Sequence, residues 1–267
     1  MTSASHVEGG HRAQGSPALD RSVFVRPIAH RGLHDHTQGR LENTAPAFRA
    51  AIHKHYGIEC DLQAAEDGTP MVFHDPKLDR LVAASGPIAA YMPSKLSRFR
   101  YKGQNEKILT FTQFLELVEG RVPVLVEVKV NGTMPHGTFL DKIARAARAY
   151  DGPVALMSFD RAIVAELAAR APKVPRGLIV GSHQILTSLW ARRKTRRAHP
   201  SPSRLFGPNR DGIGFYAVDV KLAAVARKSM TRNALDIPLF TWTVRTPRQR
   251  AMAARWADAP IFEGYEA

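Results

Sequence analysis

Acidic side chains alternate along apolar runs of the sequence. Glu59 and Asp61 flank Cys60 in the run Ile58–Ala64, and Glu127 lies in a later run. Successive side chains of a β-strand point to opposite faces, so Glu59 and Asp61 should share one face. Neighbouring buried carboxylates are costly unless a cation is present, and oxygen ligands suit Mg²⁺ or Ca²⁺ better than Zn²⁺. The alternative for any single acid is a structural ion pair with a nearby Lys or Arg.

Two histidines are placed for proton transfer. His30 ends the first apolar run, and His74 follows a short apolar run. A histidine pair lets one imidazole accept a proton from a nucleophile while the other protonates a leaving oxygen. The chain has eleven histidines, and those in loops or on helices, including His34, are expected to be solvated. Arg31 and Lys129 add positive charge suited to phosphate, although a salt bridge with nearby acids is the simpler role for Lys129.

The remaining pattern predicts the scaffold that positions these residues. Eight strand-like runs alternate with amphipathic stretches, and eight βα units in about 245 residues fit a (β/α)8 TIM barrel. Active sites of such barrels lie at the C-terminal ends of the strands. A doubly wound sheet is the rival, but no glycine-rich phosphate loop follows the first run. The expected strands are Phe24–Ala29, Ile58–Ala64, Val122–Val130, Val154–Ser158, Gly177–Val180, Phe215–Val220, Leu239–Val244 and Pro260–Phe262.

Three segments depart from this repeat. Residues 1–22 are polar and lack the apolar run of a secretory signal, so we expect a disordered tail on a cytoplasmic chain, with the catalytic domain spanning 23–267. Residues 66–109 follow the second strand and are rich in turn residues, which predicts a short insertion at the barrel mouth. Residues 191–212 include five basic residues in the six from Arg192 to Arg197, and we expect an exposed, solvated basic segment.

Composition limits the possible functions. The single cysteine excludes a disulfide scaffold, and no run approaches the roughly 20 apolar residues of a membrane-spanning helix. The 38 Lys and Arg against 24 Asp and Glu give a net charge of +14, which raises the possibility of nucleic-acid binding. Only Trp190 and Phe206 lie near the basic run, too few for a stacking platform, so nucleic acid is a disfavoured partner. Attraction of an anionic substrate is a sufficient explanation for the remaining charge.

The order of these motifs resembles that in the glycerophosphodiester phosphodiesterase family. Members of this family are metal-dependent (β/α)8 barrels related to phosphatidylinositol-specific phospholipases C. The resemblance extends over roughly residues 23–267 and is most specific between residues 28 and 80. The segments that carry it are Ile28–Gly32, Glu42–Phe48, Gly57–Gln63, Glu66–Asp75, Leu78–Arg80, Glu127–Lys129, Ser158–Phe159 and Trp242–Val244. The last strand departs from the common pattern, because Glu263 stands where many members have an Asp.

The resemblance implies roles for side chains around the barrel mouth. The implied metal ligands are Glu59, Asp61 and Glu127. The implied acid/base pair is His30 and His74. Arg31 and Lys129 would contact the phosphate. Glu42 and Asn43 would support the metal and the substrate from the rim of the cavity. Trp242 would form the wall on the alcohol side of the pocket.

The expected reaction is metal-dependent hydrolysis of a glycerophosphodiester to sn-glycerol 3-phosphate and an alcohol. One histidine would deprotonate either the neighbouring glycerol hydroxyl or a water, and the other would protonate the leaving alcohol. The expected metal is Mg²⁺ or Ca²⁺, with Mn²⁺ as a further candidate. The alternative is a lysophospholipase D-like enzyme that contacts an anionic membrane through Arg192–Arg197. The sequence indicates no oligomeric state.

Overall fold

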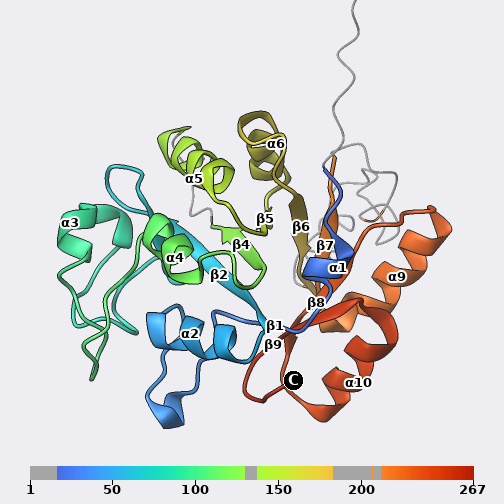
Figure 1. Cartoon of the computed structure of the whole chain (residues 1–267), viewed down its shortest axis with the longest axis horizontal. Coiled ribbons are helices and arrows are strands. Elements are labelled where there is room, and N and C mark those ends of the chain that lie inside the picture. Colours follow the sequence, from blue (N-terminus) through green and yellow to red (C-terminus); the bar gives the residue numbers. More distant parts are fainter. Residues whose placement is uncertain (1–16, 130–136, 183–205, 207–211) are drawn as a thin grey trace, which may run out of the picture.

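The computed structural model describes residues 17–129, 137–182, 206 and 212–267, and within them eight parallel strands close into a barrel (Figure 1). Closure occurs at β1 (Ile28–Ala29), which pairs with both β2 (Gly57–Ala64) and β9 (Ala259–Phe262). This closure confirms the predicted (β/α)8 barrel and excludes a doubly wound sheet. Between β2 and β9 the ring continues through β4 (Val124–Val128), β5 (Val154–Ser158), β6 (Arg176–Val180), β7 (Phe215–Asp219) and β8 (Leu239–Val244).

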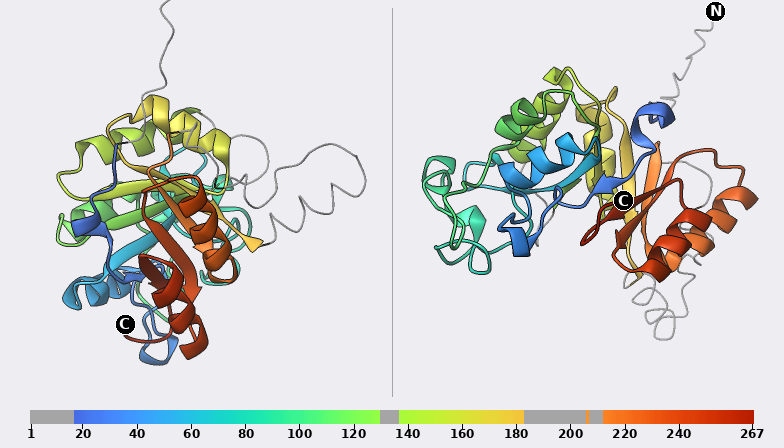
Figure 2. Two further views of the ribbon diagram at one scale, coloured as in Figure 1. Left: turned by 90° about the vertical axis from the view of Figure 1, so that its right-hand side faces the viewer. Right: turned by 60° about the horizontal axis from the view of Figure 1, so that its bottom comes forward.

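Helices follow the strands along the chain and cover the outside of the barrel (Figures 1 and 2). Thr110 and Thr246 begin two of them with capping boxes, in which the threonine hydroxyl and a glutamine three residues later satisfy each other's backbone amides. Asp160 caps a third through the amide of Ala162. The helices that pack on the barrel are α2 (Ala45–His53), α4 (Phe111–Val118), α5 (Gly137–Ala149), α6 (Arg161–Arg170), α9 (Ala223–Arg232) and α10 (Pro247–Trp256).

The alternation of side chains along the strands separates an interior core from an outer core. Cys60 and Val126 belong to the outer core beneath the helices, whereas Leu125, Phe215 and Phe240 belong to the interior cluster. These three interior residues lie near the N-terminal ends of their strands, whereas on β2 and β4 the inward positions closer to the C-terminal ends carry the carboxylates Glu59, Asp61 and Glu127. The barrel therefore has an apolar floor beneath a polar mouth, as the position of active sites in this fold requires.

The folded chain begins before residue 23, which corrects the expected boundary of the tail. Asp20 accepts a hydrogen bond from the amide of Ser22 and begins α1 (Arg21–Phe24). Leu19 and Phe24 are buried in the interior cluster, so this helix packs against the floor of the barrel. The expected first strand is correspondingly too long, because Phe24 reaches the floor from a helical turn. Residues 1–16 lie outside the described part of the chain.

Residues 66–109 form a lobe at the C-terminal end of β2. The lobe begins with β3 (Pro70–Val72), which pairs antiparallel with β2, and the expected insertion therefore adds a ninth strand to the sheet. It continues through η2 (Ile88–Ala90) and α3 (Pro93–Leu96). The lobe has its own apolar core, which includes Met71, Phe73, Leu78, Val82, Ile88, Leu96, Tyr101 and Ile108. This core fixes the end of β3, where His74 follows.

The expected basic segment, including Arg192–Arg197, lies outside the described residues except at two positions. One of these, Phe206, is fully buried and meets the ring of Tyr216 edge-on at 5.1 Å between centroids. Phe206 is thus a core residue, which corrects the expectation of an exposed segment at that position. Among the described helices, none has the length and apolar character needed to cross a membrane.

We predict that Phe24→Ala lowers the free energy of unfolding by about 3 to 5 kcal/mol, because the truncation leaves a cavity in the barrel floor. Urea denaturation followed by circular dichroism measures this change. The control is Val225→Ala, since Val225 is 44% exposed on α9 and its truncation should change stability by less than about 0.5 kcal/mol. A similarly small effect of Phe24→Ala would show that α1 does not contribute to the core.

Candidate functional site

A cavity of about 290 Å³ opens at the C-terminal ends of the barrel strands. Its polar lining comes from the C-terminal ends of β1, β2, β4 and β8 and from the lobe, and consists of His30, Arg31, Glu59, His74, Glu127, Lys129, Thr243 and Arg245. Its other side is largely apolar and includes Met157, Phe159, Ile179, Trp242 and Ile261. The structure therefore brings seven of the ten site residues expected from the sequence to one cavity. The remaining three, Glu42, Asn43 and Asp61, contact Arg31 or Lys129 directly.

Three carboxylates converge at the bottom of this cavity. Asp61 on β2 stands in register with Glu127 on β4, and Glu59 precedes Asp61 by two residues on the same face. One oxygen from each carboxylate lies within 4.8 Å of the others. Burial raises the pKa of Glu59 well above its usual range, and the neighbouring carboxylates Asp61 and Glu127 raise it further. Burial is also the main reason that the pKa of Glu127 rises to about 7.

Asp61 is held as an anion at the centre of this cluster. Burial opposes its ionisation, but Lys129 and Arg31 outweigh burial and hold the pKa of Asp61 well below its usual range. Lys129 Nζ lies 3.0 Å from Asp61 Oδ1 and 2.6 Å from Glu127 Oε1, and Arg31 Nε lies 3.2 Å from Asp61 Oδ2. Asn43 Nδ2 donates a hydrogen bond to the same Asp61 Oδ2 at 2.9 Å. The fixed cations thus compensate Asp61 more fully than they compensate Glu59.

The donor set fits a hard divalent cation. All three groups are carboxylates, and Glu59 and Asp61 are only 2% and 1% exposed. Within the described part of the chain, the buried Asp61 Oδ1 forms an ion pair with Lys129 Nζ at 3.0 Å and accepts no further hydrogen bond, which leaves a lone pair for a ligand. A divalent cation at this position would also offset the repulsion that raises the pKa of Glu59. The cluster could therefore hold a divalent metal ion.

A left-handed turn after β1 aligns the backbone with this cluster. Arg31 and Gly32 have φ values of 56° and 79°, and the Arg31 amide donates to Glu59 Oε2 at 3.0 Å. Glycine is required at position 32, because a Cβ there would lie 2.9 Å from the carbonyl carbon of Ala47. The Asn43 amide donates to the Arg31 carbonyl oxygen at 2.9 Å, which fastens the turn to the start of α2.

Glu42 anchors two arginines beside the site. Its carboxylate accepts hydrogen bonds from Arg31 Nη1 at 2.7 Å and from Arg80 Nη2 and Nη1 at 2.7 and 2.9 Å. Although burial opposes it, these guanidinium groups hold the pKa of Glu42 below its usual value. Arg80 also binds Asp75 through Nε at 2.6 Å. The expected rim residue Glu42 thus acts on the site through Arg31, since Arg31 contacts Asp61.

Each of the two cavity histidines is paired with a carboxylate through Nδ1. His30 Nδ1 lies 2.8 Å from Glu263 Oε2, and His74 Nδ1 lies 2.6 Å from Asp75 Oδ1. An ionised carboxylate only accepts hydrogen bonds, so Nδ1 carries the proton in both rings and Nε2 is free to exchange one. Burial lowers the pKa of both imidazoles below the usual value.

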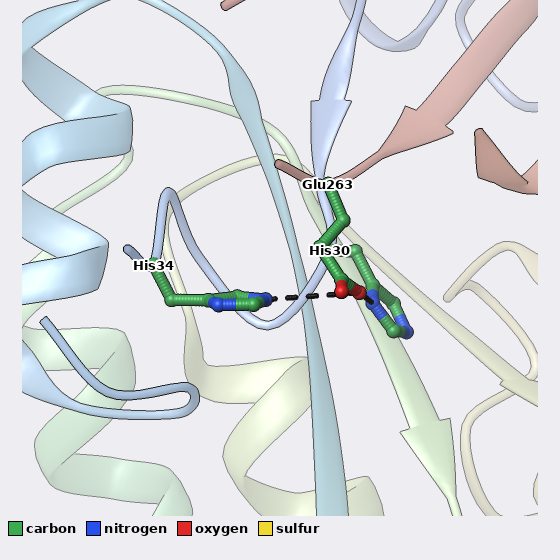
Figure 3. Close-up of side chains that lie close together, drawn as sticks. All are labelled: His30, His34 and Glu263. Atoms are coloured by element: carbon green, nitrogen blue, oxygen red, sulfur yellow. Dashed lines mark hydrogen bonds and ion pairs between the residues drawn. The ribbon is translucent and has the colours of Figure 1, made fainter. Parts of the chain in front are cut away.

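The sequence interpretation of His34 was wrong. Its side chain is only 9% exposed, and its Nε2 lies 3.7 Å from Glu263 Oε2, because the turn after β1 packs against the end of β9 (Figure 3). Arg245 and Glu263 were also missed as members of the site. Both directly follow apolar strands, so the strand-end rule that selected His30 would have found them.

The strand-end residues and the fold match one known family. The profile of the glycerophosphoryl diester phosphodiesterase family matches residues 30–263, which is most of the chain. The chain belongs to this family. It is therefore an enzyme of a hydrolase family, as the sequence motifs predicted.

Relatives and solved structures agree with this assignment to the glycerophosphoryl diester phosphodiesterases. A Mycobacterium tuberculosis protein named "Probable glycerophosphodiester phosphodiesterase 1" is 26% identical over 211 residues, which cover 70% of this chain and 71% of the relative. An Oleispira antarctica phosphodiesterase, solved in complex with the product sn-glycerol-3-phosphate, has a TM-score of 0.71 at 19% identity and covers 89% of this chain and 92% of its own. A glycerophosphodiester phosphodiesterase from Thermotoga maritima has a TM-score of 0.63 at 21% identity, with 90% and 94% covered. At these identities, the solved structures establish the shared fold.

We predict that Glu59→Gln stabilises the metal-free phosphodiesterase by on the order of 1 kcal/mol. The raised pKa of Glu59 means that the folded state disfavours the ionised form, which the unfolded chain carries at neutral pH, and the neutral isostere removes this cost. Urea unfolding at neutral pH with EDTA measures the difference. Added Mg²⁺ or Ca²⁺ should then stabilise the wild type more than the variant.

The matched control is Glu266→Gln, since Glu266 pairs with Lys54 on the exposed surface. This variant should behave like the wild type with and without metal. A Glu59→Gln protein less stable than the wild type in EDTA would contradict the repulsion between the clustered carboxylates.

Proposed function

We propose that this phosphodiesterase hydrolyses glycerophosphodiesters to sn-glycerol 3-phosphate and an alcohol, with a divalent metal and two catalytic histidines. The observation that carries the proposal is that His30 and His74 line one cavity together with Glu59 and Glu127. The product named in the Oleispira antarctica complex supports the choice of substrate. The cavity volume of about 290 Å³ lies at the small end of ligand sites, which favours a small soluble diester.

Positive charge and an apolar wall would hold the two halves of the substrate. Arg31 and Lys129 line the cavity and present fixed cations to a phosphodiester anion. On the other side, Trp242 Nε1 donates to the Ala217 carbonyl oxygen at 3.1 Å, and the indole meets Phe159 edge-on. These contacts fix the indole ring, so it would pack against the alcohol portion without reorganising. A divalent cation bound by the three carboxylates would withdraw charge from the phosphate oxygens.

The two imidazoles would exchange protons through their Nε2 atoms. One Nε2 accepts the proton of the attacking oxygen, which belongs to the neighbouring glycerol hydroxyl or to a water, as this oxygen bonds to phosphorus. The other imidazole starts as the cation and donates its Nε2 proton to the alcohol oxygen as the second phosphorus–oxygen bond breaks. Attack by the glycerol hydroxyl gives a cyclic phosphate first, and a second cycle with water opens it.

The all-carboxylate ligand set supports Mg²⁺ or Ca²⁺ as the metal, with Mn²⁺ as a further candidate. These ions accept oxygen ligands readily, whereas Zn²⁺ favours nitrogen and sulfur. The three ligands are Glu59, Asp61 and Glu127.

We predict that His30→Ala and His74→Ala each lower kcat by about 10²- to 10⁴-fold, because each removes one proton-transfer group. EDTA should abolish activity of the wild type, and added Mg²⁺, Ca²⁺ or Mn²⁺ should restore it. Release of sn-glycerol 3-phosphate from glycerophosphocholine, followed by a coupled dehydrogenase assay, measures both effects. Glu266→Gln, on the exposed surface, is the control with wild-type activity. Turnover that survives chelation and both histidine substitutions would end this proposal.

We predict that soluble glycerophosphodiesters are turned over efficiently without vesicles, because the small cavity favours a small substrate. The competing lysophospholipase D-like activity would act on lysolipids and depend on an anionic surface that binds Arg192–Arg197. A substrate panel of glycerophosphocholine, glycerophosphoethanolamine and lysophosphatidylcholine, with and without phosphatidylserine vesicles, separates the two activities. The contrary result is that the protein cleaves lysolipids efficiently only when these vesicles are present and cleaves the soluble diesters poorly. That result would favour the lysophospholipase D-like activity over glycerophosphodiester hydrolysis.

A further inference from the structure

Glu263 joins three basic side chains at the seam of the barrel. We propose that Glu263 is a positioning residue for His30, which holds the imidazole with its proton on Nδ1 and its Nε2 toward the cavity. This role rests on the proposed function, because it presupposes that His30 transfers a proton. Neither the family resemblance nor the sequence motifs assigned Glu263 a role.

The contact arises from the register of the barrel closure. Ala29 of β1 pairs with Phe262 of β9, and the His30 amide donates to the Phe262 carbonyl oxygen at 2.9 Å. The next residue, Glu263, therefore emerges beside the His30 ring, and its Oε2 lies 2.8 Å from Nδ1. Figure 3 shows the carboxylate between the imidazoles of His30 and His34. On its other side, His30 Nε2 lies 3.9 Å from Glu59 Oε2, at the carboxylate cluster.

A guanidinium group fixes the carboxylate in this orientation. Arg245, which follows β8, binds Glu263 at two points, with Nε 3.1 Å from Oε1 and Nη2 3.0 Å from Oε2. Two-point binding between planar groups restricts rotation of the carboxylate. Burial opposes ionisation of Glu263, but the hydrogen bonds from His30 and Arg245, together with the His34 ring 3.7 Å away, hold the pKa of Glu263 well below its usual range. The carboxylate is therefore ionised, accepts the Nδ1 proton and selects the tautomer with a free Nε2.

A transition-metal site is the competing reading of the same residues. One ligand atom from each of His30, His34 and Glu263 lies within 4.8 Å of the others, and two histidines with a carboxylate suit Zn²⁺. Arg245 disfavours this reading, because its guanidinium group already binds both oxygens of the carboxylate. A metal ion would have to displace this cation or lie beside it, so the geometry favours positioning of His30.

The primary test compares Glu263→Gln with the wild type at saturating glycerophosphocholine and metal. Glutamine keeps the size of the side chain but replaces one acceptor oxygen with a donor, so it no longer enforces a proton on His30 Nδ1. We expect kcat to fall by about 10²-fold or more with little change in KM, as when the orienting carboxylate of a catalytic histidine is replaced by its amide. The control is Glu266→Gln, three residues away, with wild-type kcat.

A double-mutant cycle separates positioning from a structural effect. If Glu263 acts through His30, Glu263→Gln should have no further effect on the residual rate of His30→Ala. Equal losses in both backgrounds, or a kcat of Glu263→Gln within twofold of the wild type, would overturn the proposal. Loss of catalysis in His30→Ala with an unaffected Glu263→Gln would overturn the positioning role alone. Full activity of His30→Ala would overturn the role of His30 in the proposed function, and the positioning role with it.

The tautomer of His30 gives a readout that does not depend on turnover. In protein labelled with ¹⁵N-histidine, the His30 signals are assigned by their loss in His30→Ala, and their ¹⁵N shifts report which nitrogen carries the proton. We expect Nδ1–H in the wild type and a shift toward Nε2–H in Glu263→Gln. The same tautomer in both proteins would contradict the proposal. Zn²⁺ inhibition that vanishes in Glu263→Gln, with equal zinc-free rates, would instead assign a metal site and overturn positioning.

Discussion

The repulsion among three buried carboxylates is the constraint on which the site depends. Glu59, Asp61 and Glu127 share one face because side chains alternate along β2 and because β4 pairs with β2 in register. The register holds the three side chains on neighbouring positions of one buried face, so their charge must be compensated locally. Lys129 and Arg31 provide this compensation, and both are themselves fixed by ion pairs with the acids. The mouth of the barrel is therefore a network of opposite charges in which the raised pKa of Glu59 marks the incomplete compensation.

Barrel closure supplies the second requirement, which is a fixed imidazole beside the carboxylate cluster. β1 is only two residues long, yet it pairs with both β2 and β9. The residue after it, His30, consequently lies between Glu59 from one neighbouring strand and Glu263 from the other. A short seam strand is sufficient, because its neighbours fix its register from both sides. The geometry of His30 is thus a consequence of closure and not of the local sequence alone.

The sequence predicted the features that depend on local periodicity. Alternation placed Glu59 and Asp61 opposite Cys60, and the structure indeed puts Cys60 in the outer core. The eight barrel strands were also predicted, because each is a short apolar run between turn signals. Features that depend on contacts between distant segments escaped the prediction. Glu263 lies 233 positions from His30. The strand-end rule places both residues at the barrel mouth, but no periodic pattern in either segment indicates that their side chains meet.

The same limit explains the error at the N-terminus. An apolar run that includes Phe24 is compatible with a strand or with a helix, and periodicity does not distinguish these for so short a segment. The outcome was decided by the floor of the barrel, where Phe24 packs against the interior cluster. His34 was misjudged for a related reason, since its burial requires the end of β9. Tertiary packing, rather than local preference, fixed both positions.

The two histidines are held by similar groups that are connected differently to the rest of the site. On one side, Asp75 binds Arg80, and Arg80 also binds Glu42, the partner of Arg31. A change at Arg80 therefore alters the partner of His74 and, through Arg31, the charge compensation of the carboxylate cluster. On the other side, Glu263 and Arg245 pair with each other across the ends of β8 and β9. Among the contacts of the described residues, His30 links that pair to the cluster, so we expect that the orientation of one imidazole can be altered there without disturbing the network around Asp61.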